Sequence, residues 1–282
     1  MYKRLLFILL LLLGAIGLIV VSAGSVSEAI VEDMRIDEAS GIAASFKTEG
    51  ILYTHNDSGG KPVVYTLNSR GLMPTKLVLE GVKNRDWEDI AVSRDPKDGR
   101  SYIFVGEIGD NNARYSSVFV YRFEEPALLD TLISIRKIDK IEIQYEDGPR
   151  DAEALFVDPK KGDIYIISKR EEKVGLYQVA YPQSYTQINI AKKVATLPLS
   201  MVTAADICPK GKYILVKTYT GVMRYTRSGK TSIAKAMSKK PKPMPYKIEP
   251  QGEAIGWDYG GKGYFTLSER APEQPLILYY YK

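Results

Sequence analysis

Residues 250–258 read PQGEAIGWD, and three earlier stretches repeat the phrase: RDAEALFVD at 150–158, RDWEDIAVS at 85–93 and DEASGIAAS at 37–45. In each stretch an acidic or hydroxyl residue comes just before a short apolar run, which is typical of a chain entering a buried strand. Several copies of one phrase indicate a repeated structural unit.

Two series of strands are expected after these phrases. The first consists of apolar runs that end in polar residues, such as ILYTHND at 51–57 and SYIFVGEIG at 101–109. The second has a tyrosine at a matching place in each copy: Tyr65, Tyr121, Tyr177, Tyr225 and Tyr279. Turns rich in Gly, Asp, Asn and Pro separate the runs. Amphipathic helical periodicity is hard to find, so we expect an all-β fold.

The repeats predict a β-propeller. Aligned on the apolar residue that follows, the phrases place one residue per copy in a column: Ser40, Glu88, Glu153, Ala205 and Glu253. The intervals are 48, 65, 52 and 48 residues, the length of a four-stranded blade. The last copy stops after its tyrosine strand, and residues 26–36 have no other place. We therefore expect them to supply the missing outer strand and close a five-bladed ring, or a six-bladed one if the 65-residue interval holds another blade.

The N-terminal 23 residues differ from the rest. MYKR precedes 17 uncharged residues at 5–21 and a small-residue site, VSA, which is typical of a secretory signal peptide. The alternative is an uncleaved N-terminal anchor, because 17 residues is at the short limit for a membrane span. Both place residues 24–282, a single propeller domain, outside the cytoplasm: periplasmic, extracellular or membrane-anchored and facing outward. Membrane contact is expected only through this segment if it remains uncleaved.

The net charge and the cysteine content bear on nucleic-acid binding and on disulfides. The formal net charge is +5, a mild excess that, together with export, gives no reason to expect a nucleic-acid partner. The single cysteine, Cys208, forms no disulfide within the chain.

The column predicts a metal site. First strands of propeller blades line the axis, so the column becomes a ring, with a second ring two residues earlier formed by Glu38, Asp86, Asp151, Thr203 and Gln251. Crowded carboxylates need a counter-charge, and Ca²⁺ accepts six to eight oxygen ligands in irregular geometry. We expect Ser40, Glu88, Glu153 and Glu253 to bind it. The alternative is that these acids cap strands or pair with Arg85, Arg150 and nearby lysines.

The motifs DWEDIA, GEIGDNNAR, DAEALFVDP and PQGEAI resemble a family of exported bacterial β-propeller proteins of uncharacterised function, over nearly all of the chain after residue 23. The ring column resembles, more distantly, the calcium-dependent apyrases. Those are five-bladed propellers in which serines and glutamates hold an axial Ca²⁺, and they hydrolyse nucleoside di- and triphosphates. The resemblance implies the same four ligands. Ala205 departs from the serine that it implies, and Thr203 or Asp206 would substitute.

Polar residues at the ends of the second strands are expected to gather on one face, the mouth. They are His55, Asn56, Asp57, Glu107, Asp110, Asn111, Lys169, Arg170, Lys217, Thr218, Glu269 and Arg270. Above a Ca²⁺ ion, acids from two blades and bases from the next three suit an anionic small molecule. Asp57 is our candidate general base or orienter of a metal-bound water, or else a turn aspartate that bonds its own backbone.

Three functions follow from these features. The first is a calcium-stabilised propeller without catalysis that binds a ligand or a protein partner on one face. The second is a calcium-dependent hydrolase of a phosphate ester or anhydride, similar to an apyrase or phytase, and a lactonase or esterase comes third. Propellers support binding and catalysis alike, so the fold does not decide whether the protein is an enzyme. Convergence of Lys169, Arg170, Lys217 and Arg270 on a cavity would favour hydrolysis.

Overall fold

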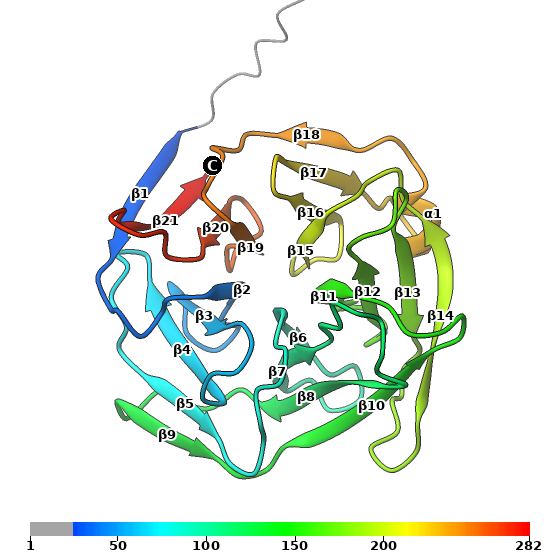
Figure 1. The fold of residues 1–282 in the computed structure, drawn as a ribbon, viewed down its shortest axis with the longest axis horizontal. Helices are drawn as coiled ribbons and strands as arrows, with labels where there is room; N and C mark the ends of the chain where they lie inside the picture. Colours follow the sequence, from blue (N-terminus) through cyan, green and yellow to red (C-terminus); the bar gives the residue numbers. More distant parts are fainter. Residues whose placement is uncertain (1–24) are drawn as a thin grey trace, which may run out of the picture.

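The first strands of successive sheets surround the centre of the molecule (Figure 1). The computed structural model describes residues 25–282, so the predicted signal peptide or anchor at 1–23 lies outside the described residues. Each central strand contacts the next around the ring, and the last contacts the first. These inner strands are β2 (Ala39–Ala44), β6 (Asp89–Arg94), β11 (Ala152–Val157), β15 (Val202–Ile207) and β19 (Gly252–Trp257).

Each inner strand begins an antiparallel unit that extends outward from the centre. The second strands are β3 (Ile51–Asn56), β7 (Ser101–Glu107), β12 (Ile164–Ser168), β16 (Tyr213–Thr218) and β20 (Tyr264–Ser268). The third strands are β4 (Val63–Asn68), β8 (Val118–Glu124), β13 (Gly175–Val179), β17 (Gly221–Thr226) and β21 (Leu276–Tyr281). All five predicted tyrosines lie buried in the third strands. The radial arrangement of these sheets is that of a β-propeller, as the repeats predict.

The two ends of the described chain meet in one sheet. Strand β1 (Val26–Val31) pairs antiparallel with β21, from Val26 opposite Tyr281 to Val31 opposite Leu276. The sheet order is therefore β1-β21-β20-β19 (Figure 1). This confirms the prediction that residues 26–36 supply the missing outer strand and close the ring.

The long 65-residue interval supplies two outer strands. Strand β5 (Lys76–Leu79) is the outer strand of the first unit, and β9 (Leu132–Ile135) pairs parallel to it as a fifth strand. Strand β10 (Asp139–Tyr145) is the outer strand of the second unit. It also pairs parallel with β14 (Asn189–Thr196), which joins the second and third units into one eight-stranded sheet. The extra residues therefore lie on the rim, and none of these strands lies among the five around the centre.

The fourth unit differs from the sequence-based expectation. A short helix, α1 (Ile233–Met237), precedes its outer strand β18 (Lys242–Met244). Ser232 caps the helix by accepting the N–H of Lys235, and Ile233 and Met237 are buried in the core. The all-β expectation included no helix, because five residues are too few to show helical periodicity.

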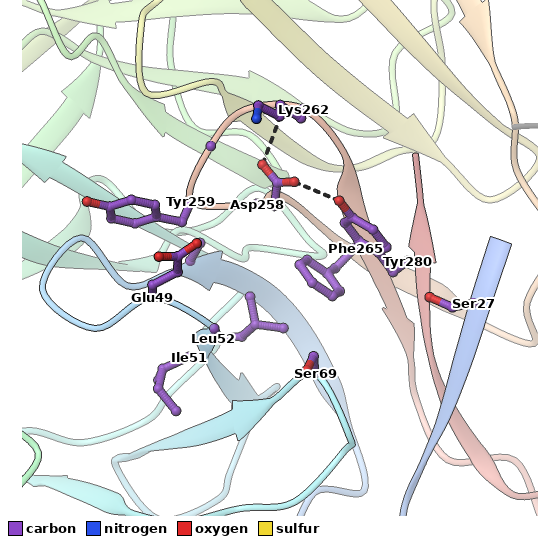
Figure 2. Close-up of a pocket in the computed structure, with 13 residues that line it drawn as sticks. Ser27, Glu49, Ile51, Leu52, Ser69, Asp258, Tyr259, Lys262, Phe265 and Tyr280 are labelled. Carbon is purple, nitrogen blue, oxygen red and sulfur yellow. Dashed lines mark hydrogen bonds between the residues drawn. The ribbon is translucent and has the colours of Figure 1, made fainter. Parts of the chain in front are cut away.

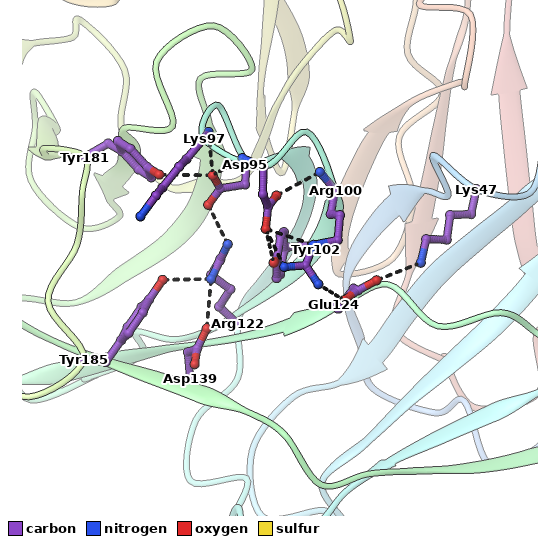
Figure 3. A network of polar contacts seen from close by, with 11 residues as sticks. Lys47, Asp95, Lys97, Arg100, Tyr102, Arg122, Glu124, Asp139, Tyr181 and Tyr185 are labelled. Atoms are coloured by element: carbon purple, nitrogen blue, oxygen red, sulfur yellow. Dashed lines mark hydrogen bonds and ion pairs between the residues drawn. The ribbon is translucent and has the colours of Figure 1, made fainter.

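Asp95 closes the hairpin turn after β6 and begins a polar network at the rim of the second unit. Asp95 accepts the N–H of Lys97 at 2.7 Å, so its side chain closes the turn after β6. Asp95 also binds Arg122, whose guanidinium reaches Asp139 at 2.8 Å (Figure 3). Arg122 is buried against the ring of Tyr102, with 3.5 Å to the ring centroid. This network ties the outer strand of the second unit to its inner hairpin.

Within residues 25–282, no helix is long and apolar enough to cross a membrane.

Candidate metal centre

A β-bulge places one side chain per unit at the start of the inner strand. In four units the pairing of inner and second strand skips one residue, and these residues are Ser40, Glu153, Thr203 and Glu253. A bulge re-aims the side chain of the extra residue, and bulges are common next to functional sites. In the second unit Glu88 takes this place, with its N–H on the carbonyl of Gly106 at 2.9 Å.

The ring therefore contains Thr203 where the sequence alignment placed Ala205. The alignment was wrong by two residues in the fourth unit, because the Asp-Ile pair at 206–207 was matched to the pair at 89–90. Ala205 is buried against the core. Asp206, the other suggested substitute, accepts the N–H groups of Ile207 and Trp257, each at 2.7 Å. Its carboxylate therefore links β15 to β19 and belongs to neither group of clustered carboxylates in the described residues.

Asp89 is also a structural aspartate. It is fully buried and accepts three backbone N–H groups: those of Ile90 and Leu155 at 2.9 Å and that of Ala205 at 3.2 Å. One carboxylate therefore links the inner strands of the second, third and fourth units. Asp89 and Asp206 are thus bonded to backbone N–H groups, and neither belongs to the two predicted rings of acids.

Five carboxylates gather at the mouth around Asp57. Oxygens of Asp57, Glu253 and Glu269 lie within 4.8 Å of one another, and so do those of Asp57, Asp86 and Glu88. Asp57 thus belongs to both groups of three. Asp57 is positioned by its backbone N–H, which donates to the carbonyl of Glu38 at 2.8 Å just after β3 ends. We call these five residues the axial carboxylate cluster.

The cluster is electrostatically crowded. Burial and the neighbouring charges of Asp86 and Glu253 raise the pKa of Asp57 to about 7. Burial and Glu253 raise the pKa of Glu269 to about 7 as well. The pKa of Glu88 is raised well above its usual value by burial and then by Glu153 and Asp57. A bound proton or cation would relieve this repulsion.

Lys169 supplies a counter-charge on one side of the ring. Its ammonium binds Glu153, lies 4.0 Å from Glu253 Oε1 and is 3.1 Å from the hydroxyl of Tyr219. Burial raises the pKa of Glu153 to about 8, and the Lys169 charge offsets this only in part. Glu153 Oε2 is buried without a hydrogen-bond partner in the described structure. The predicted ligand Glu153 is therefore held by an amine, whereas no lysine or arginine of residues 25–282 forms an ion pair with Asp57, Asp86, Glu88 or Glu269.

Part of the predicted mouth does assemble around Asp151. Arg170 Nε donates to Asp151 Oδ2 at 2.5 Å, and its Nη2 also contacts Asn111. The backbone N–H of Asp110 donates to Asp151 Oδ1 at 3.1 Å. These contacts satisfy Arg170 within the protein, so its charge is largely neutralised by Asp151.

Two predicted mouth bases point elsewhere, which corrects that part of the prediction. Lys217 is fully buried, donates to the carbonyl of Gly252 and lies 3.8 Å from Glu249. Burial lowers its pKa to about 8. Arg270 Nη2 donates to the carbonyls of Val31, Asp33 and Ile36 at 3.0 to 3.3 Å, which fastens the segment after β1. Lys169, Arg170, Lys217 and Arg270 therefore do not converge on one cavity.

Three other predicted mouth residues also lie outside the cluster. His55 is fully buried with its ring edge against Trp87, 5.6 Å between centroids, and burial lowers its pKa to about 4. Asn56 donates to Asp37 Oδ1 at 2.6 Å. Glu107 accepts from the hydroxyl of Tyr121 at 3.3 Å and faces Arg85 instead of the axis.

The sequence analysis did not predict Tyr219 as a site residue. Its hydroxyl donates to Glu253 Oε1 at 2.7 Å and contacts Lys169, so it orients two ring side chains. Its position in the turn after β16, next to the predicted mouth residues Lys217 and Thr218, was the available signal.

Comparisons with known proteins add little to this geometry. No protein-family model matches the chain, and no curated protein matches it. Among solved structures, the chain is similar to one titled "Structure of Dos1 propeller", with 11% sequence identity and a TM-score of 0.39. The similarity covers 86% of this chain and 67% of that chain. The β-propeller architecture described above rests on the strand pairing itself.

Proposed function

We propose that the protein binds Ca²⁺ at the axial carboxylate cluster and acts as a cation-stabilised propeller that binds a ligand or partner, without catalysing a reaction. The observation that carries the proposal is the position of Asp57, which belongs to two groups of three carboxylates within 4.8 Å. Their raised pKa values mean that the folded protein holds these charges at a cost that a cation would remove.

The chemistry of the donors favours Ca²⁺. All donors in the cluster are carboxylate oxygens, which suit hard cations, whereas zinc and copper sites use Cys and His. His55 is turned to the carbonyl of Asn56, and Cys208 is buried where it accepts backbone N–H groups of its own turn. Ca²⁺ tolerates irregular geometry and more than six ligands, while Mg²⁺ requires near-octahedral coordination.

The ligand set differs from the one expected from sequence. Glu88 and Glu253 stay in it, and Asp57, Asp86 and Glu269 join them. Ser40 Oγ donates to the carbonyl of Glu88 at 2.6 Å and lies 3.4 Å from its carboxylate, so in our proposal it orients that glutamate. In the same proposal Lys169 occupies the place of the ion beside Glu153.

Binding is favoured over phosphate hydrolysis by the positions of the basic residues. A hydrolase of this kind would need cationic side chains that face the metal to hold a phosphate. Lys217 is bonded to the carbonyl of Gly252 and paired with Glu249, Arg270 is bonded to the carbonyl of Val31, and Arg170 is paired with Asp151. Asp57 lies within the proposed ligand set, which makes it a metal ligand in our proposal in place of a general base.

Export is a part of the proposal that rests on residues 1–23. A basic start followed by 17 uncharged residues would bring the propeller out of the cytoplasm. Extracellular calcium modules work with dissociation constants of about 10⁻⁴ to 10⁻³ M, so even a weak axial site would be filled there.

Isothermal titration calorimetry with CaCl₂ tests the proposal. The purified protein, stripped with EDTA and dialysed, is expected to bind one Ca²⁺, and Asp57→Asn is expected to abolish the heat because it removes the shared ligand. Asp130→Asn is the matched control, since Asp130 is an exposed aspartate on the rim. Absence of binding to the wild-type protein at millimolar Ca²⁺, or equal binding to Asp57→Asn, would contradict the proposal.

A further inference from the structure

Three of the cavities differ in the charged side chains that line them. The cavity in Figure 2, about 300 Å³, contains Asp258, which is bonded to Tyr280 and to the backbone of Lys262. A second cavity, about 550 Å³, is lined by Arg100 and Arg122 of the network in Figure 3, both paired with acids, and also by Arg136 and Lys137. The third cavity shares Arg136 with the second and is also lined by Lys83, Arg85 and Lys140.

The third cavity lies between the first and second units. It has a volume of about 560 Å³, within the range of small-molecule sites. Its walls are formed by residues 80–85 between β5 and β6, by Arg136 and Ile138 between β9 and β10, and by Lys140 of β10. Glu107 of β7 and Tyr121 of β8 complete the lining. We call it the inter-unit cavity.

Four cationic side chains line the inter-unit cavity, against two acids. Lys83, Arg136 and Lys140 are exposed, and none forms an ion pair with a residue in the described part of the chain. The Arg85 guanidinium has only Glu107, at 3.8 Å, as an acidic partner. Cations that converge without partners concentrate positive potential and attract anions.

Aromatic rings hold two of these cations in place. Arg85 stacks 3.9 Å from the ring centroid of Tyr115, and Lys140 Nζ lies 3.6 Å from that of Phe119. Such contacts fix a cation without neutralising it. Glu107 is buried and accepts from Tyr121 and from the backbone N–H of Arg85, so its charge is already engaged.

We propose that the inter-unit cavity binds a small organic anion whose carboxylate or phosphate group contacts Arg136, Lys140 and Lys83. The volume exceeds that of an inorganic ion, and Val82 and Ile138 give the cavity an apolar surface for the rest of the ligand. The inter-unit cavity shares no residue with the axial carboxylate cluster, so the proposal of an anion site does not depend on calcium binding.

Isothermal titration of the full-length protein with phenyl phosphate, benzoate and inorganic phosphate, at low ionic strength and in EDTA, tests the site. At least one organic anion is expected to bind saturably and more tightly than inorganic phosphate, and the tighter of the two identifies the charged group. The double variant Arg136→Gln/Lys140→Gln should weaken binding at least about fivefold. The control Lys239→Gln/Lys240→Gln removes the same charge from exposed positions in the fourth unit and should bind as the wild type does.

Three results would overturn the proposal. The first is no saturable binding of either organic anion up to about 10 mM, which is weaker than any useful site. The second is an equal loss of affinity in both double variants, which would show attraction by net charge alone. The third is equal affinity for inorganic phosphate, which would exclude an organic ligand. Melting temperatures of the variants within about 2 °C of wild type establish that they fold.

Discussion

The substitution Asp57→Asn is expected to have opposite effects on stability without and with calcium. In EDTA the variant should be more stable than the wild type at pH 8, because it removes one of five mutually repelling carboxylates. The pKa of Asp57 is raised to about 7, which means that the ionised carboxylate is less favourable in the folded protein than in the unfolded chain. After allowance for solvent screening the gain is about 1 kcal/mol.

Calcium should reverse the order of the two proteins. At about 10 mM Ca²⁺, a hundred times a dissociation constant of about 10⁻⁴ M, the filled site stabilises the folded state by about 2.7 kcal/mol. For a chain of this size, each kcal/mol raises the melting temperature by about 2 to 4 °C. The wild type should therefore melt about 5 to 10 °C higher in millimolar Ca²⁺ than in EDTA, while Asp57→Asn should change little.

Thermal unfolding followed by circular dichroism, with each protein in EDTA and in Ca²⁺, measures both effects. Asp130→Asn serves as the control and should match the wild type in each buffer, because this aspartate is exposed on the rim. The reasoning is refuted if Asp57→Asn is less stable than the wild type in EDTA and still gains several degrees with Ca²⁺. Asp57 would then be a turn residue with no role in the cluster.

Three further predictions concern the acids and the packing around the axis. In EDTA the melting temperature should fall as pH rises from 6.5 to 8, because Asp57 and Glu269, with pKa values of about 7 in the folded protein, keep protons that the unfolded chain has lost above about pH 4. Ca²⁺ should flatten this dependence, and a rise with pH would contradict it. Two groups oppose the trend outside this window: His55, whose folded pKa is about 4, below the histidine pKa of the unfolded chain, and Lys217, whose folded pKa is about 8, at higher pH. Asp89→Ala should cost about 3 to 5 kcal/mol in urea unfolding, since three buried backbone N–H groups lose their acceptor; a loss below about 1 kcal/mol, the level expected for an exposed aspartate, would show that water replaces it. Gly41→Ala should destabilise by about 1 to 3 kcal/mol, because the added Cβ would lie 2.7 Å from a backbone nitrogen of β6; an unchanged urea midpoint would mean that the two inner strands separate freely.

The repeat and its closure could be predicted from the sequence because they depend on local patterns. Alternation of apolar and polar residues, turn residues and a tyrosine in each third strand act within about ten positions of one another. The strand left over at 26–36 follows from a count of strands per unit, and β1 pairs with β21 as that count requires. The carboxylates near the axis were also predictable, since Glu88 and Glu253 follow from the repeat column.

The composition of the site was decided by tertiary structure. The Asp-Ile pair at 206–207 repeats the pair at 89–90, and only the pairing of β15 with β16 places Thr203, instead of Ala205, at the ring position. Whether a basic side chain at a strand end faces the axis depends on partners far away in the chain: Arg270 bonds carbonyls more than 230 residues earlier. Asp57 meets Asp86 when the first two units pack together, and it meets Glu253 of the last unit only after the ring closes. Local sequence patterns specify strands, because side-chain alternation and turn geometry are short-range. Ion pairs and ligand sets depend on which strands become neighbours, and only the closed ring of units determines that.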